Sequence, residues 1–261
     1  MPRELTPSFC APLTLAECLA QLDEQGFDPA DELSLQNAAS LLAGLAANRG
    51  FLGDLLVDLL AGADDQASGY GPQAIMLAGP RNGYFLRANI WPSRGDLAFQ
   101  ASGPASFVYG LPHDHNFDFL TVGYFGPGYV SDYGEYDYAS VSGEAGEAVD
   151  LRCVERSQLS EGRVLHYRAH RDVHCQHPPE SLSVSLNICA ANPAQGWFDQ
   201  YRFDTEAGRI AGVLNASANE VLLRLGVALG GEDARHCAQH FATHHPSAAM
   251  RRVASTMIRS E

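Results

Sequence analysis

The feature that most constrains the fold is a dense run of short strand patterns over residues 73–189 that no helical pattern interrupts. Alternating apolar and polar residues over Tyr84–Trp91 and Ser181–Cys189 are typical of half-buried strands. Between the strands lie Gly- and Pro-rich turns, and Asn82-Gly83 tolerates the positive φ angles of a tight hairpin turn. Because no helix separates the strands, parallel βαβ units are excluded, and we predict an antiparallel sandwich or barrel. The other expected strands are Ile75–Leu77, Phe107–Tyr109, His113–Tyr124, Tyr129–Tyr138, Ala148–Glu155 and Gly162–His170.

Helical periodicity marks both ends of the chain. Thr14 and Glu17 have capping-box spacing ahead of a leucine-faced helix, and Ser217 and Glu220 repeat that spacing near the C-terminus. The other helical segments are Leu33–Ala47, Phe51–Leu60, Val221–Leu229, Glu232–His244 and Ser247–Ile258, and Gly62–Pro72 is expected to be a linker. We therefore predict an N-terminal helical subdomain (1–70), a central β-barrel (71–203) and a C-terminal helical extension (204–261).

Composition excludes several partners. The chain has a formal net charge of −14, and all 17 of its positive residues are arginine, so a nucleic-acid-binding surface is not expected. No segment approaches the roughly 20 apolar residues that span a bilayer, and residues 1–13 lack the pattern of a signal peptide. We expect a cytoplasmic protein without membrane association. Its six scattered cysteines include no CxxC pair, which favours free thiols.

The histidines indicate the chemistry. On a strand, residues two apart point to the same face, so His113 and His115 can offer nitrogen to one metal ion. A third ligand is expected from the stretch that runs from Gly162 through a strand to His174, with His177 as the rival. The two remaining histidines of that stretch, expected at the rim or surface, are His166 and His170.

This arrangement resembles the cupin superfamily of small jelly-roll barrels over roughly residues 73–192. The matching residues are Gly110, His113, His115 and Gly126 in the first cupin motif, and Gly162 and His174 in the second. The glutamate of the first motif falls at Phe119 or Leu120, so the resemblance implies three neutral imidazoles, as in the three-histidine thiol dioxygenases. Such a centre with open positions suits Fe(II), which can bind substrate and O₂ side by side; Zn²⁺, Mn²⁺ and Ni²⁺ are the alternatives.

The chain also departs from the cysteine dioxygenases, which its Pro112–His115 segment resembles. These enzymes carry Ser-x-His-x-Tyr on the strand after the third ligand, where this chain has Ser183-Val-Ser185-Leu-Asn187. A cysteine substrate is therefore not implied. The polar face formed by Ser183, Ser185 and Asn187 lines a substrate cavity if it turns inward and is solvated if it turns outward.

Proton transfer and substrate binding have four candidates. If Gly126–Gly128 is a hairpin turn, Phe119 lies opposite Glu135, which then shares the inward face with the histidines. Glu135 is then a fourth ligand, a base that orients a histidine, or simply a solvated acid. Tyr133 is the second candidate for handling protons, and Arg87 and Arg168 are candidates for holding a substrate carboxylate.

These observations favour a non-haem Fe(II) oxygenase acting with O₂ on a small polar or amino-acid-like substrate. The alternatives are isomerase, lyase or hydrolytic chemistry with another divalent metal, and a ligand- or metal-sensing barrel without turnover. We expect a two-fold homodimer. A second histidine series, His236, His240 and His244, is expected to face solvent. A facial triad built on His170 and Asp172 would need a distant helical histidine such as His240 and is disfavoured.

Overall fold

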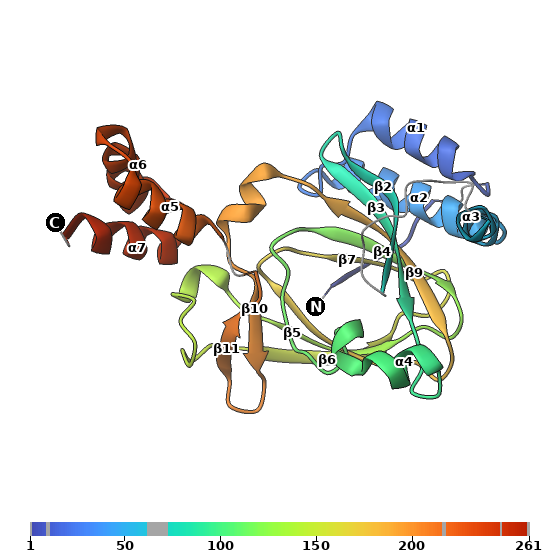
Figure 1. Cartoon of the computed structure of the whole chain (residues 1–261). Coiled ribbons are helices and arrows are strands. Elements are labelled where there is room, and N and C mark those ends of the chain that lie inside the picture. Colours follow the sequence, from blue (N-terminus) through green and yellow to red (C-terminus); the bar gives the residue numbers. More distant parts are fainter. Residues whose placement is uncertain (1, 9–10, 62–72, 216–217, 246, 260–261) are drawn as a thin grey trace.

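The computed structural model describes residues 2–8, 11–61, 73–215, 218–245 and 247–259, and two antiparallel sheets form its centre (Figure 1). The larger sheet contains, in spatial order, β1 (Arg3–Leu5), β7 (Val164–Tyr167), β4 (Phe119–Phe125), β9 (Ser183–Ala190), β3 (Tyr84–Trp91) and β2 (Ala74–Arg81). The smaller sheet contains β6 (Arg152–Gln158), β5 (Val130–Glu135) and β8 (Asp172–His177). From β4 to β9 the chain passes repeatedly between the sheets, which is the double-sheet arrangement of a jelly roll. The expected mainly-β class with helical additions is confirmed, as two facing sheets whose described strands do not close into one barrel.

The larger sheet is covered on both faces. Successive side chains of a strand point to opposite faces, one toward the N-terminal helices and the other toward the smaller sheet. On β9, Leu186 and Ile188 belong to the core formed with the N-terminal helices, whereas Ser185 and Asn187 point toward the smaller sheet. The N-terminal helices are α1 (Leu15–Gln25), α2 (Glu32–Ala47) and α3 (Phe51–Leu60). The predicted capping box is present at α1, where the Thr14 Oγ1 accepts from the Glu17 amide at 3.2 Å.

Aromatic side chains fill the space between the sheets. This inner core combines Trp91 and Tyr167 of the larger sheet with Tyr133 of the smaller one. Near its edge lie the short helices α4 (Leu97–Ser102) and η1 (Pro104–Phe107). The inner core leaves a polar region at one end, where the histidines gather.

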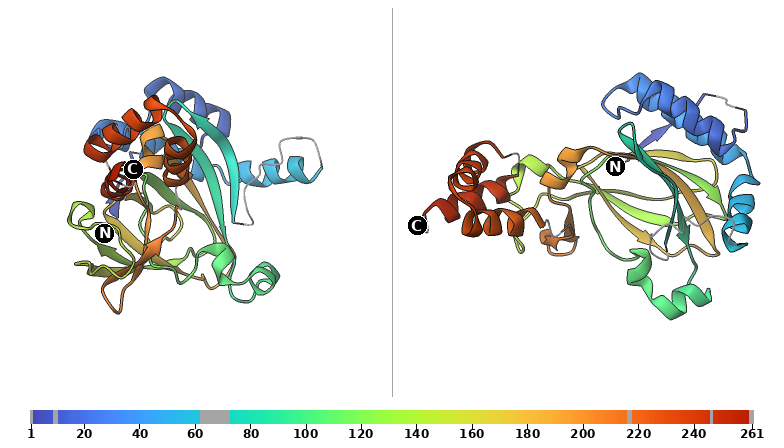
Figure 2. Two further views of the ribbon diagram at one scale, coloured as in Figure 1. Left: turned by 60° about the vertical axis from the view of Figure 1, so that its left-hand side comes forward. Right: turned by 45° about the horizontal axis from the view of Figure 1, so that its top comes forward.

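The C-terminal helices form a separate small core (Figure 2). They are α5 (Ala218–Leu229), α6 (Glu232–His244) and α7 (Ala248–Arg259). Trp197, in η3 (Pro193–Trp197), connects this unit to the sheets by packing against Phe241 and His245. As expected, His236, His240 and His244 are exposed.

Several local predictions are wrong. Residues 107–109 form no strand, because Val108 has a left-handed φ of 58° after η1. Beyond residue 204 the chain first forms β11 (Arg209–Val213), which pairs with β10 (Tyr201–Asp204). A strand over 113–124 is also incorrect, since β4 begins only at Phe119.

The proposed hairpin between β4 and β5 does not form either. Glu135 lies opposite Asp172 and Arg152, not opposite Phe119. The reason is that the chain crosses from one sheet to the other at Gly126–Gly128 and packs closely there. A Cβ atom on Gly128 would lie 1.8 Å from the Leu159 carbonyl oxygen, so this crossing requires glycine.

The remaining sequence predictions concern the linker, the cysteines and membrane-spanning segments. The linker Gly62–Pro72 and the capping residue Ser217 lie outside the described residues. The five described cysteines are free, as expected. Taken singly, no described helix has both the length and the apolar character needed to cross a bilayer; α2 and α3 meet these criteria only together, with a 69° bend between them.

Candidate metal centre

Two of the three clustered histidines lie on a connecting segment that is held between strands β8 and β10. The His113 and His174 backbones exchange hydrogen bonds of 3.0 and 2.9 Å, and the Phe203 amide donates to the Pro112 carbonyl at 2.9 Å. The His115 carbonyl accepts from the His170 amide at 2.8 Å. The segment is thus fixed on both sides although it is not a regular strand, and His113 and His115 still point the same way.

Asp114, between the two histidines, ties this segment to its surroundings. Its side chain is fully buried and accepts from the Tyr136 hydroxyl at 2.5 Å and from the Tyr201 amide at 2.6 Å. Burial raises the pKa of the Asp114 carboxyl to about 7, against the effect of these hydrogen bonds. Asp114 faces away from the histidine cluster and anchors the segment from behind.

The Nε2 atoms of His113, His115 and His174 converge. The His115 and His174 nitrogens are 2.9 Å apart, and the His174 and His113 nitrogens are 3.2 Å apart. Two donors each about 2.1 Å from one ion lie about 3.0 Å apart at a right angle and about 3.4 Å apart at a tetrahedral angle. The spacing therefore fits a single metal ion.

The electrostatics of the cluster also suit a cation. Burial lowers the pKa of His113 to about 4 and, together with the neighbouring imidazoles, holds the pKa of His174 well below its usual range. The His113 Nδ1 lies 2.8 Å from the Leu111 carbonyl, which fixes the proton on Nδ1 and leaves the Nε2 lone pair directed at the cluster. Three neutral imidazoles with convergent nitrogens are the donor set of a metal site, and the predicted ligand group is brought together.

A cavity of 460 Å³ opens beside the cluster. The side chains of Arg87 and Asn187, two of the candidates for substrate binding, line it, and the buried Arg87 Nε has no partner among the described residues. Of the two orientations that the sequence left open for the polar face of β9, the structure has the inward one, since Ser183, Ser185 and Asn187 are buried. The Ser183 and Ser185 hydroxyls instead serve the framework, since they accept from the Gly128 amide at 3.0 Å and from the Trp91 indole at 2.9 Å.

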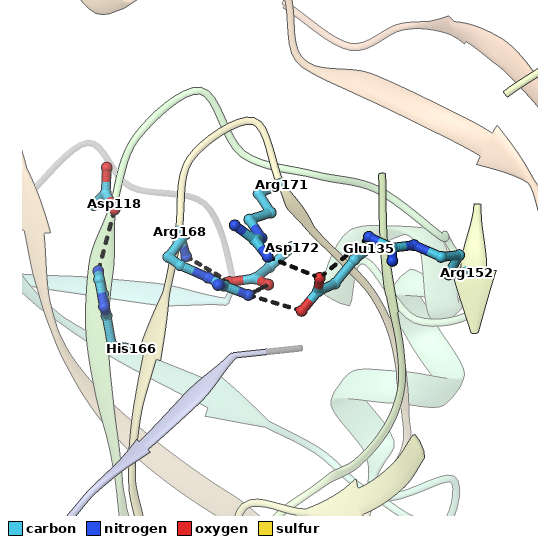
Figure 3. Close-up of polar contacts among 7 residues, drawn as sticks. All are labelled: Asp118, Glu135, Arg152, His166, Arg168, Arg171 and Asp172. Carbon is cyan, nitrogen blue, oxygen red and sulfur yellow. Dashed lines mark hydrogen bonds and ion pairs between the residues drawn. The ribbon is translucent and has the colours of Figure 1, made fainter. Parts of the chain in front are cut away.

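Glu135 and Arg168 lie together in a separate ion network (Figure 3). The Arg168 guanidinium bonds Glu135 at 2.9 Å and the buried Asp172 at 2.6 Å, and Arg171 reaches Glu135 at 3.2 Å. None of these residues is among those that line the histidine cavity. The parity argument brought Glu135 to the inward face, but arginines and not the histidines surround its carboxylate.

Tyr133 lies behind the cluster in a chain of phenols. It is opposite His174 in the pairing of β5 with β8, and its hydroxyl is 2.9 Å from the Tyr167 hydroxyl. The Tyr167 ring packs against the His174 ring at 4.9 Å. Burial raises the pKa of Tyr133, so this phenol stays protonated at neutral pH.

The other histidines of the second cluster point elsewhere. His177 pairs with Asp132 at 2.7 Å, so His174 and not His177 joins the cluster. His166 contacts Asp118 at 3.1 Å, and His170 packs its ring against Tyr138 at 4.3 Å.

Asn89, Tyr129 and Gln176 are among the cavity residues that sequence reasoning missed. Gln176 was detectable, because it is two residues beyond His174 and alternation on a strand places both on one face. Asn89 was detectable in the same way, because it is two residues beyond Arg87 on the predicted strand, whereas Tyr129 carries no such signal.

No protein-family model matches the chain, and no curated protein matches it. Among solved structures it is similar to a cupin domain from Bordetella pertussis Tohama I (16% identity, 48% of this chain and 100% of that chain, TM-score 0.26). It is also similar to hydroquinone 1,2-dioxygenase from Sphingomonas sp. TTNP3 (9% identity, 48% and 70% covered, TM-score 0.30). A third is the DMSP lyase DddQ from Ruegeria pomeroyi DSS-3 (10% identity, 74% and 79% covered, TM-score 0.29). These likenesses identify no family. At such TM-scores they carry no inference, and the fold rests on the strand pairings alone.

Proposed function

We propose that His113, His115 and His174 hold a divalent metal, with Fe(II) the first choice, and that the protein is an oxygenase acting on a small polar, anionic substrate. The observation that carries this proposal is the convergence of three neutral imidazole nitrogens, from the buried His113 and His174 and the partly buried His115, beside a polar cavity. A bound Fe(II) would supply open coordination positions at which O₂ and a substrate donor react. No carboxylate joins the described cluster, so the centre keeps a net charge of +2, which favours anionic donors.

Arg87 is the residue that we assign to substrate anchoring. Its guanidinium lines the cavity, its Nε lacks a partner among the described residues, and no described carboxylate forms an ion pair with it. Arg87 as a whole is only partly buried, but its buried Nε is a donor without a partner, and an anionic substrate group would satisfy it with a forked pair of hydrogen bonds. The adjacent Asn187, directly opposite Arg87 in the strand pairing, adds a neutral polar group to the same wall.

Proton handling at the cavity falls to a phenol and not to a carboxylate. Tyr129 lines the cavity, and burial raises its pKa well above the usual range, so it acts as a hydrogen-bond donor. Tyr133 supports it indirectly, through the Tyr167 hydroxyl that both phenols approach.

The same three-histidine donor set also supports a second candidate, a metal-dependent lyase or hydrolase. Three neutral histidines with an open position are also the donor set of catalytic zinc sites, in which the metal lowers the pKa of bound water. The histidine geometry suits both ions.

The test is metal analysis of the purified protein together with O₂ uptake and product analysis against thiols, amino acids and 2-hydroxy acids. We expect the wild type to contain one equivalent of iron and to take up O₂ in the presence of substrate. His174→Ala should lose both the iron and the O₂ uptake, and Arg87→Met should raise the KM for the substrate. Bound zinc with substrate cleavage and no O₂ uptake would support the second candidate. A protein that binds none of the divalent metals would overturn both.

A further inference from the structure

Gln176 is a polar residue that lies beside the histidine nitrogens but does not belong to the cluster itself. It follows His174 by two residues on β8, is 4% exposed and lines the same cavity. Its Nε2 lies 3.4 Å from the His174 Nε2, and its Oε1 is buried without a hydrogen-bond partner among the described residues. A buried amide oxygen without a partner is costly, so the position calls for a group that the protein itself does not provide.

A metal ion on the cluster would change what this amide can do. A metal would occupy the His174 Nε2 lone pair, and the glutamine N–H would then point its positive hydrogens toward a cation. The oxygen and nitrogen of a glutamine amide have nearly the same shape, and a half-turn of the amide exchanges them. That rotation would bring the carbonyl oxygen, a donor suited to hard divalent cations, to the side of the metal.

We propose that the Gln176 side-chain oxygen is a fourth protein ligand of the metal, an inference that rests on the metal centre proposed above. The separation of 3.4 Å from the His174 nitrogen equals the spacing of about 3.4 Å between two ligands of one ion at a tetrahedral angle. The three histidines and Gln176 come from only two segments, 113–115 and 174–176, which the backbone hydrogen bonds between His113 and His174 hold together.

This assignment has a distinct electrostatic consequence. A fourth ligand that is a neutral amide completes the donor set without reducing the +2 charge of the centre. A glutamate at the same position would lower the charge to +1 and bind cations more tightly at neutral pH. The amide therefore leaves the attraction for an anionic substrate intact, which agrees with the Arg87 Nε that has no partner among the described residues in the same cavity.

The test uses the full chain, stripped of metal and titrated with Mn²⁺ and with Co²⁺. The variants are Gln176→Leu, which removes the donor at similar volume, and Gln176→Glu, which restores a charged donor. The matched control is Gln73→Leu, the same substitution at a glutamine that lines the same cavity but donates to the Phe107 carbonyl at 3.0 Å. His113→Ala serves as the variant that lacks a histidine ligand, and circular dichroism confirms folding of each.

We expect Gln176→Leu to weaken Mn²⁺ binding by about tenfold or more, and Gln176→Glu to strengthen it by a similar factor. The visible spectrum of bound Co²⁺, which reports coordination geometry, should change in Gln176→Leu and stay unchanged in Gln73→Leu. Wild-type affinity and an unchanged Co²⁺ spectrum in Gln176→Leu, with binding lost in His113→Ala, would overturn the glutamine ligand alone. Absence of binding in the wild type would overturn the metal centre as well.

Discussion

Two polar clusters lie inside the double sheet, and they differ in how completely they satisfy themselves. In the ion network, Asp172 has no exposed side-chain surface, and its two oxygens accept three hydrogen bonds from Arg168. In the histidine cluster, the three Nε2 atoms lie against one another, and neutral imidazoles cannot supply a hydrogen bond to every one of them. The Nδ1 atoms of His115 and His174 also lack partners among the described residues. The first cluster is closed and the second is open.

This difference distinguishes polar residues that stabilise the fold, as in the ion network, from polar residues that are available to bind a ligand, as in the histidine cluster. The two clusters meet on β8, where Asp172 of the ion network and His174 of the histidine cluster are both buried, so burial alone does not distinguish them. Pairing does distinguish them, because opposite charges neutralise each other in the network, whereas the neutral histidines and the Arg87 Nε without a partner can still bind a ligand. The comparison predicts that mutations in one cluster change metal binding and mutations in the other change folding stability.

The largest effect is expected for His113→Ala. Loss of one of three imidazoles should reduce Fe(II) or Co(II) affinity by about 100-fold or more, because the remaining pair cannot complete the site. The metal-free protein should lose only the stability that the buried imidazole and its bond to the Leu111 carbonyl contribute, since no ion pair is broken. Calorimetric titration with metal and urea denaturation with a chelator present measure the two quantities. Unchanged metal affinity would break the comparison.

The next largest effect is expected for Asp172→Asn, which should reduce folding stability and leave metal affinity unchanged. This substitution leaves the Arg168 guanidinium, 22% exposed, without its main counter-ion, and should lower the free energy of unfolding by about 3 kcal/mol. Metal affinity of the folded variant should stay within twofold. Urea denaturation and metal titration of the same preparation measure both quantities. A loss of metal affinity with unchanged stability would contradict the prediction and show that Asp172 contributes to metal binding.

A pH titration sharpens the contrast further. Burial lowers the pKa of His113 to about 4, below the value of about 6.5 in an unfolded chain. The unfolded chain therefore binds more protons between these values, so stability is complete above pH 6.5 and is lost as the pH falls toward 4. The expected slope is about 1.4 kcal/mol per pH unit for each such histidine. Urea denaturation at pH 7, 6 and 5 with a chelator should give a shallower slope for His113→Ala than for the wild type; equal slopes would show that His113 is not neutralised by folding.

The smallest effect is expected for Glu135→Gln, and it decides between two predictions. The sequence argument predicts that activity changes far more than folding, whereas the ion network predicts a loss of about 1 kcal/mol in stability with unchanged metal affinity. Arg152→Ala is the control, since Arg152 is 68% exposed and 3.8 Å from Glu135, and it should change stability by less than about 0.5 kcal/mol. A large loss of activity at wild-type stability in Glu135→Gln would return this carboxylate to the catalytic machinery.

Local patterns in the sequence were sufficient for much of the fold and for the metal-binding histidines. The ranges Tyr84–Trp91 and Phe51–Leu60 match β3 and α3 to the residue, because alternation and helical periodicity are local properties. His113 and His115 were found because HxH parity survives even in an irregular segment that neighbouring strands hold extended, and His174 was found from its spacing after Gly162.

Contacts between distant segments could not be predicted in the same way. The pairing of β5 with β8 instead of β4 depends on the close approach of Gly128 to Leu159, which leaves no trace in alternation. Arg87 and Arg168 look equivalent in the sequence, and only the structure shows that Arg168 has two carboxylate partners. The short hairpin β10–β11 was missed because strands of four and five residues give too weak a periodic signal.

The measurement that tests the central claim most directly is anomalous X-ray diffraction from crystals of the full chain loaded with Fe(II) or Co(II), recorded at the metal absorption edge. The account predicts one dominant anomalous peak about 2.0–2.2 Å from the Nε2 atoms of His113, His115 and His174. A peak at the exposed His240 and His244, or at the network of Glu135 and Asp172, with none between the three histidines, would contradict it.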